Sequence, residues 1–155
     1  MDHSHHHRSN MSLNRTAWSV TLHCLTGCAI GEVLGMVIGT ALGWGNGPTI
    51  ALAVTLAFIF GFGLTLMPLL KATSFHAALK LALAADTASI TVMEIVDNAL
   101  MLAIPGAMDA GLGSLLFWAS LAFSLALAAV AAFPINRWLI VRGKGHAVVH
   151  AYHHH

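Results

Sequence analysis

Four residues with reactive or metal-binding side chains lie in one apolar segment, in the pattern H-C-x-x-x-C-x-x-x-E that runs from His23 to Glu32. Residues four apart share one face of an α-helix, so Cys24, Cys28 and Glu32 form a single row, which Met36 extends. Thiolates and thioethers are ligands that soft metal ions such as Cu(I) prefer. The His23 side chain points about 100° away from that of Cys24 on an ideal helix, so it could join the row only where the helix end is irregular. The pattern predicts a metal-binding face on this helix.

Ordinary packing also accounts for the two thiols, because cysteine is a small hydrophobic residue that is often buried. Glu32 favours a functional interpretation, since a carboxyl group inside a membrane-spanning helix is costly and commonly marks a functional site. A redox-active dithiol usually has the spacing C-x-x-C, which the chain lacks, and a structural disulfide is disfavoured in a reducing cytoplasm.

A second polar group lies in the segment ADTASITVMEIVDNALM, where Asp86, Glu94 and Asp97 share one broad helical face with Ser89 and Asn98. No Lys or Arg falls within an apolar segment of the chain to neutralise these acids. Three explanations are open: the acids are protonated, they bind a cation, or they line internal water. Hydrogen bonding between helices is the structural alternative, because such bonds stabilise helix bundles modestly.

The composition predicts an all-α integral membrane protein. The 155 residues are 57% hydrophobic and only 8% charged, whereas a soluble domain is usually about 25% charged. Four apolar segments, at residues 18–43, 49–70, 81–104 and 112–135, each reach the roughly 20 residues that a helix needs to cross a bilayer. We expect a four-helix transmembrane bundle at residues 17–142, between polar, His-rich tails at residues 1–16 and 143–155.

The basic residues predict the orientation of the bundle. With four spans, all seven Lys and Arg side chains fall on one side of the membrane, so both termini are expected in the cytoplasm. The first and third spans then run in the same direction. At a rise of about 1.5 Å per residue, Cys24 lies at the depth of Asp86 and Glu32 at the depth of Glu94. We expect Met36 and Met101 at the outer mouth of the resulting path.

Glycines recur every fourth residue beside the cysteine row, at Gly27, Gly31, Gly35, Gly39 and Gly43. Overlapping G-x-x-x-G motifs let a second helix approach closely. The neighbouring helix could belong to the same chain or to another copy, and we expect a homo-oligomer.

The two tails hold nine of the eleven histidines. At the C-terminal end, His146, His150, His153 and His154 would share one face of a helix, and neutral imidazole suits Zn, Cu and Ni. We expect these side chains to collect or receive a metal ion in the cytoplasm. An expression tag is the alternative explanation for the last three histidines.

Three segments resemble a bacterial family of membrane proteins, the one called domain of unknown function 4396. They are HCLTGCAIGEVLG, ADTASITVMEI and RGKGHAVVHAYH, and the resemblance extends from about Leu22 to Tyr152. It implies a multispan protein of the bacterial inner membrane, with a copper-handling protein as a partner. The family has no defined activity, so the resemblance adds no catalytic residue.

We therefore expect a protein of the lipid bilayer that binds or translocates a copper or zinc ion along a path lined by the Cys, Glu and Asp side chains. No phosphate-binding loop or nucleophile elbow predicts an enzyme, and no basic patch predicts nucleic-acid binding. One alternative is a membrane anchor or oligomeric assembly module whose protonated acids bond between helices. Another is a heme or quinone redox protein, which is weakened because His23 is the one histidine within an expected span.

Overall fold

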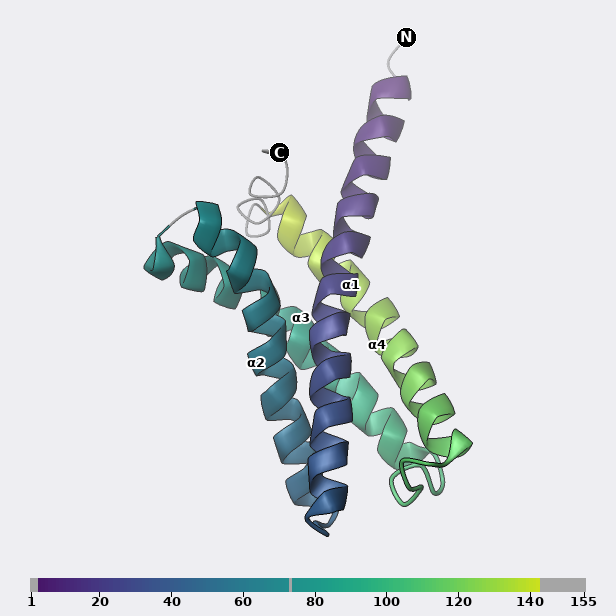
Figure 1. Ribbon diagram of the computed structural model, residues 1–155. Helices are drawn as coiled ribbons and strands as arrows, with labels where there is room; N and C mark the ends of the chain where they lie inside the picture. Colours follow the sequence, from purple (N-terminus) through teal and green to yellow (C-terminus); the bar gives the residue numbers. More distant parts are fainter. Residues whose placement is uncertain (1–2, 73, 143–155) are drawn as a thin grey trace.

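The computed structural model describes residues 3–72 and 74–142, which form four α-helices and no strand (Figure 1). The predicted all-α class is confirmed. Residues 3–16 of the predicted N-terminal tail are helical and are continuous with the first apolar helix. The C-terminal tail with its four predicted metal-binding histidines lies outside the described residues. The helices are α1 (His3–Ala41), α2 (Asn46–Ala72), α3 (Phe75–Ala103) and α4 (Leu115–Val141).

Three of the four helices are long and apolar enough to cross a membrane: Ser12–Ala41 of α1, Asn46–Met67 of α2, and all of α4. Large apolar side chains such as Leu22, Ile59 and Val130 are more than half exposed on the outside of these helices. A surface of this kind is compatible with lipid and would be costly in water, and together with the three apolar helices it indicates a membrane protein. α3 has 29 residues, but the acids on its inner face lower its hydropathy.

The helix ends fall into two groups (Figure 1). The start of α1, the α2–α3 connection and the end of α4 lie at one end of the bundle, which we call the basic end. The α1–α2 turn and the α3–α4 connection lie at the opposite end, which we call the loop end. The described basic residues outside the first turns of α1 all belong to the basic end: Arg15, Lys71, Lys80, Arg137 and Arg142.

The closest helix contact joins α1 to α2 of the same chain through the glycine row. A Cβ added at Gly27 would lie 2.5 Å from the Cα of Gly61, and one added at Gly35 would lie 2.5 Å from the Cα of Ala53. Gly31 meets the backbone of Ala57 in the same way. The two helices approach closely because no side chain separates them here. The row therefore packs against α2 of the same chain and does not face another copy.

Gly43 does not belong to this row, although its spacing predicts that it should. α1 ends at Ala41, and Gly43 lies in the following turn with φ 65° and no heavy atom within 4 Å of an added Cβ. The Trp44 N–H donates to the Gly39 carbonyl at 2.9 Å, and the Gly43 N–H donates to the Thr40 carbonyl at 3.1 Å. These two bonds form a Schellman motif, whose left-handed residue is usually glycine.

Replacing Gly31 by leucine should destabilise the monomer, because the new side chain would collide with the backbone of α2. Overpacking of a close contact costs about 1–3 kcal/mol, and more where backbone must move. Thermal unfolding in mild detergent measures the effect. Gly63→Leu is the matched control, since nothing lies within 4 Å of a Cβ at Gly63. Equal melting temperatures for the two variants would contradict the α1–α2 contact.

Candidate functional site

Four carboxyl groups are buried inside the bundle, and no Lys or Arg among the described side chains is buried with them. Glu32 comes from α1, and Asp86, Glu94 and Asp97 come from α3; each is at most 4% exposed. The three acids of α3 have a helical spacing, so their side chains lie on the same side of that helix, which is its inner face. They form two groups, which we call the Asp86 cluster and the carboxyl cluster.

The Asp86 cluster joins α1, α2 and α3. The Cys24 thiol donates to Oδ1 of Asp86 at 3.7 Å, and His23 and Thr65 lie within interaction range of the same carboxyl group. Ser89 is fully buried nearby on α3, one turn after Asp86. Oδ2 of Asp86, Nε2 of His23 and Oγ of Ser89 have no hydrogen-bond partner among the described residues. The cluster therefore has polar atoms free to bind a ligand. His23 belongs to this cluster even though α1 is a continuous helix at this position, without the irregular end that the sequence analysis required.

The carboxyl cluster consists of Glu32, Glu94, Asp97, Asn98 and Ser124. The Asn98 amide donates to Oε1 of Glu32 at 3.2 Å, to the backbone carbonyl of Glu94 at 3.0 Å, and to Oε2 of Glu94 at 3.5 Å. One amide group thus bridges α1 and α3 and holds two carboxyl groups beside each other. The pairing of Cys24 with Asp86 and of Glu32 with Glu94 follows the depths expected from the sequence.

Asp97 extends the carboxyl cluster to α4. Its Oδ1 accepts a short hydrogen bond from the Ser124 hydroxyl, which is fully buried. Oδ2 of Asp97 and Oε1 of Glu94 have no partner among the described residues. Three helices therefore supply this cluster, and two of its carboxyl groups retain an oxygen that can accept a proton or contact a cation.

The two clusters are separated by apolar residues on α3 and connected by a polar residue on α1. Ile90 and Met93 of α3 are fully buried in an apolar core that also contains Cys24 and Cys28. The Cys28 thiol lies within interaction range of Glu94. Cys28 is thus the polar side chain that links the Asp86 cluster to the carboxyl cluster, while Ile90 and Met93 form an apolar barrier beside it.

Met36 and Met101 come together as well, but in apolar surroundings. Both belong to a core cluster near the loop end, with Phe117 and Leu121 of α4. Within residues 3–72 and 74–142, no three His, Cys, Asp or Glu side chains are already arranged so that they could hold one metal ion. The residues predicted as ligands are therefore neighbours in pairs and clusters, and metal binding by them stays a prediction.

Sequence reasoning missed the polar partners on α4. Besides Ser124, Asn136 is fully buried, and its amide donates to Oγ1 of Thr21 on α1 at 2.8 Å. A signal for both was present, because small or polar residues recur every fourth position along the buried face of this helix. They are Ser120, Ser124, Ala128, Ala132 and Asn136. This row marks the side of α4 that faces the acids.

The comparisons with known proteins agree with the resemblance seen in the sequence. The model of a family described as domain of unknown function (DUF4396) matches residues 13–145. The chain belongs to the DUF4396 family. The matched region includes α1 from Leu13 onward and all of α2, α3 and α4, so it contains both clusters. No curated protein and no solved structure matches this DUF4396 chain significantly.

Replacing Asn98 by alanine should lower the free energy of unfolding, because Glu32 and Glu94 lose the amide that bridges α1 and α3. A hydrogen bond between membrane helices contributes about 0.6–1.7 kcal/mol. Unfolding by SDS in mixed micelles measures this difference. Thr91→Ala is the control on the same helix, since Thr91 is exposed and bonds only to the carbonyl of Thr87. A loss for Thr91→Ala as large as that for Asn98→Ala would contradict a bridging role for the amide.

Proposed function

We propose that this DUF4396 protein binds a cation inside the membrane and moves it along the column formed by the Asp86 cluster and the carboxyl cluster. The cargo that the ligand types favour is a soft or borderline transition-metal ion, copper or zinc. In this proposal the chain spans the bacterial inner membrane four times, with the basic end in the cytoplasm. α3 then crosses the membrane with its acidic face turned toward the other helices, while side chains such as Ile95 and Leu102 are exposed on its outer face.

The burial of Glu32, Glu94 and Asp97 together carries the proposal. Each is at most 4% exposed, and every Lys and Arg of the chain lies outside the expected apolar segments. An ionised carboxyl group without a partner is very costly in a low-dielectric interior, so such groups hold a proton or a cation. The unpartnered oxygens of Glu94 and Asp97 are available for either.

The alternation of thiol and carboxyl groups supports a metal ion as the cargo. Cys24 contacts Asp86, and Cys28 lies beside Glu94, so a soft and a hard ligand occur together at each level. Conduction needs sites that bind an ion weakly enough to release it to the next one, and two-ligand sites meet this need. The apolar barrier of Ile90 and Met93 could act as the gate, because hydrophobic constrictions block ions by excluding water.

A second candidate function is favoured by the hydrogen bonds themselves. Asn98 joins Glu32 to Glu94, and Ser124 joins α4 to Asp97, so the acids also stabilise contacts between helices. A membrane anchor or assembly module would need the acids only in this role, as protonated hydrogen-bonding groups. The two functions differ in whether the protein takes up metal ions.

The metal-binding prediction is tested with purified protein reconstituted in liposomes. Cys24→Ser/Cys28→Ser should abolish stoichiometric binding of Cu(I) or Zn(II) in the membrane domain, measured as metal per protomer by mass spectrometry. Glu32→Gln should leave binding at the thiols but stop uptake into the liposomes, because the next ligand or proton acceptor is removed. Protons compete with metal for thiolate and carboxylate, so metal affinity should fall as the pH falls.

Two controls make this test decisive. Deletion of residues 143–155 removes the five histidines of the C-terminal tail and should lower total metal while the membrane site keeps its metal. Thr26→Ser removes only a methyl group and keeps the hydroxyl that bonds to the Leu22 carbonyl within α1, so this variant should behave like the parent protein. A double cysteine variant that binds and moves metal like the parent would exclude the proposed path, and the anchor function would then take its place.

The proposed topology predicts which end of the bundle faces outward. Single cysteines placed at Asn46 and Asp109, both at the loop end, should react with a membrane-impermeant maleimide added outside spheroplasts. A cysteine at Lys71 should react only after the cells are opened. Cys24 and Cys28 are each 1% exposed and should give little background. Outside labelling at Lys71, or none at Asp109, would contradict the four-span arrangement with a cytoplasmic basic end.

A further inference from the structure

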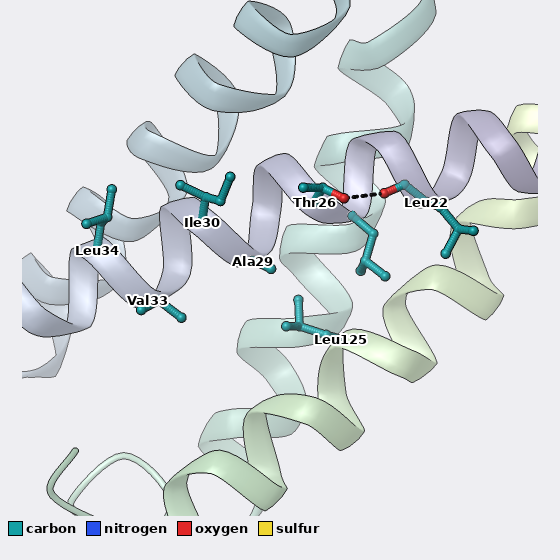
Figure 2. Close-up of a pocket in the computed structure, with 8 residues that line it drawn as sticks. Leu22, Thr26, Ala29, Ile30, Val33, Leu34 and Leu125 are labelled. Carbon is teal, nitrogen blue, oxygen red and sulfur yellow. Dashed lines mark hydrogen bonds between the residues drawn. The ribbon is translucent and has the colours of Figure 1, made fainter. Parts of the chain in front are cut away.

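A groove of about 610 Å³ follows α1 on the side where it meets α4 (Figure 2). Its walls are side chains of α1 between Leu22 and Leu34, together with Leu125 of α4. At about 1.5 Å per residue, this stretch of α1 is roughly 18 Å long. The one polar side chain in the wall is Thr26, whose hydroxyl donates to the Leu22 carbonyl at 2.8 Å. The groove is therefore apolar, and it lies within the membrane-spanning part of α1.

Toward the basic end, the same faces of α1 and α4 carry aromatic residues. The rings of Trp18 and Phe133 stack with centroids 4.7 Å apart, and Trp18 is 41% exposed. Trp18 precedes Leu22 by four residues, so it continues the row of α1 side chains that forms the groove wall. Tryptophan and tyrosine gather where a membrane meets water, because one part of the ring system is apolar and another is polar. The aromatic pair thus marks the headgroup level of the seam.

Two arginines lie one turn beyond the aromatic pair. Arg15 is exposed and lies on the groove face of α1, seven residues before Leu22, and Arg137 follows Phe133 by four residues on α4. Nε of Arg137 donates to Oδ1 of Asn14 at 2.9 Å, which uses one of its five N–H donors. The described carboxyl groups are elsewhere: four inside the bundle and Asp109 at the loop end. The seam therefore presents positive charge that no described acid neutralises.

We propose that the α1–α4 seam is a binding site for one anionic glycerophospholipid. Its phosphate contacts the guanidinium groups of Arg15 and Arg137, its glycerol region lies against Trp18, and one acyl chain fills the groove from Leu22 toward Leu34. Charge complementarity selects this occupant. A neutral lipid leaves both guanidinium groups without an anion, and a helix of a second copy would have to bring its own acid to this level.

Lipid retention measured by native mass spectrometry tests the site. Protein released from nanodiscs that contain equal amounts of phosphatidylglycerol and phosphatidylcholine should keep one phosphatidylglycerol. Arg15→Gln should weaken its binding by about fivefold, the change that corresponds to about 1 kcal/mol per basic residue at an anionic surface. Arg15→Gln/Arg137→Gln should weaken it further. Lys71→Gln/Lys80→Gln removes the same charge from the basic end at α2 and α3, and should retain the lipid.

The groove is tested separately from the arginines. Ala29→Phe places a ring in the acyl-chain path and should reduce phosphatidylglycerol retention although both arginines are intact. Ile38→Phe adds the same ring to an exposed position of α1 outside the groove wall, and should not reduce it. If the double arginine variant does not fold, Arg15→Gln alone decides, because it keeps the Asn14–Arg137 bond.

Three results would overturn the proposal. Equal retention of phosphatidylcholine would show that charge is not recognised. An equal loss in the Lys71→Gln/Lys80→Gln variant would show only a general attraction to anionic lipid. A dimer that loses its contact on Ala29→Phe would show that the groove holds a second copy. The proposal does not depend on metal transport, so the two tests fail or succeed independently.

Discussion

Burying four carboxyl groups among apolar helices without a basic side chain is the constraint on which the rest of this structure depends. Each acid must turn away from the lipid and find a polar neighbour on another helix. Asp86 finds Cys24, Glu32 and Glu94 find Asn98, and Asp97 finds Ser124. These contacts join α3 to α1 and α4, so the same requirement that hides the acids also sets which helices adjoin. The oxygens still without a partner are what give the interior a capacity for protons or cations.

α1 meets three different surroundings because its faces have three different compositions. The glycine face allows α2 to approach within van der Waals contact, and the Cys24–Cys28–Glu32 row turns toward the acids of α3. The remaining face is apolar and forms the groove beside α4. The close α1–α2 contact narrows one side of the bundle and fixes the rotation of α1, and that rotation is what directs its thiols at α3.

Side-chain hydrogen bonds and one aromatic stack join α1 to α4 at the basic end. Asn136 donates to Thr21, and Arg137 donates to Asn14. Between these bonds and the apolar cluster around Met36 and Phe117 near the loop end, the helices leave the groove open. An acyl chain in this groove would complete the packing of the seam without entering the polar column.

Composition and periodicity by themselves determined the helical membrane class, the polar row on α1, and the acidic face of α3, because a helix of known pitch fixes which residues share a side. The constant rise per residue of a helix also predicted that Cys24 and Asp86 lie at the same depth along the bundle. The tertiary structure alone decided that the glycine row faces α2, that Gly43 ends a helix, and that Ser124 and Asn136 of α4 complete the polar contacts. Single polar residues in an apolar helix show which face is buried, but not which helix lies opposite. That choice depends on how four helices rotate and cross to bury every acid at once, which no single segment of the chain specifies.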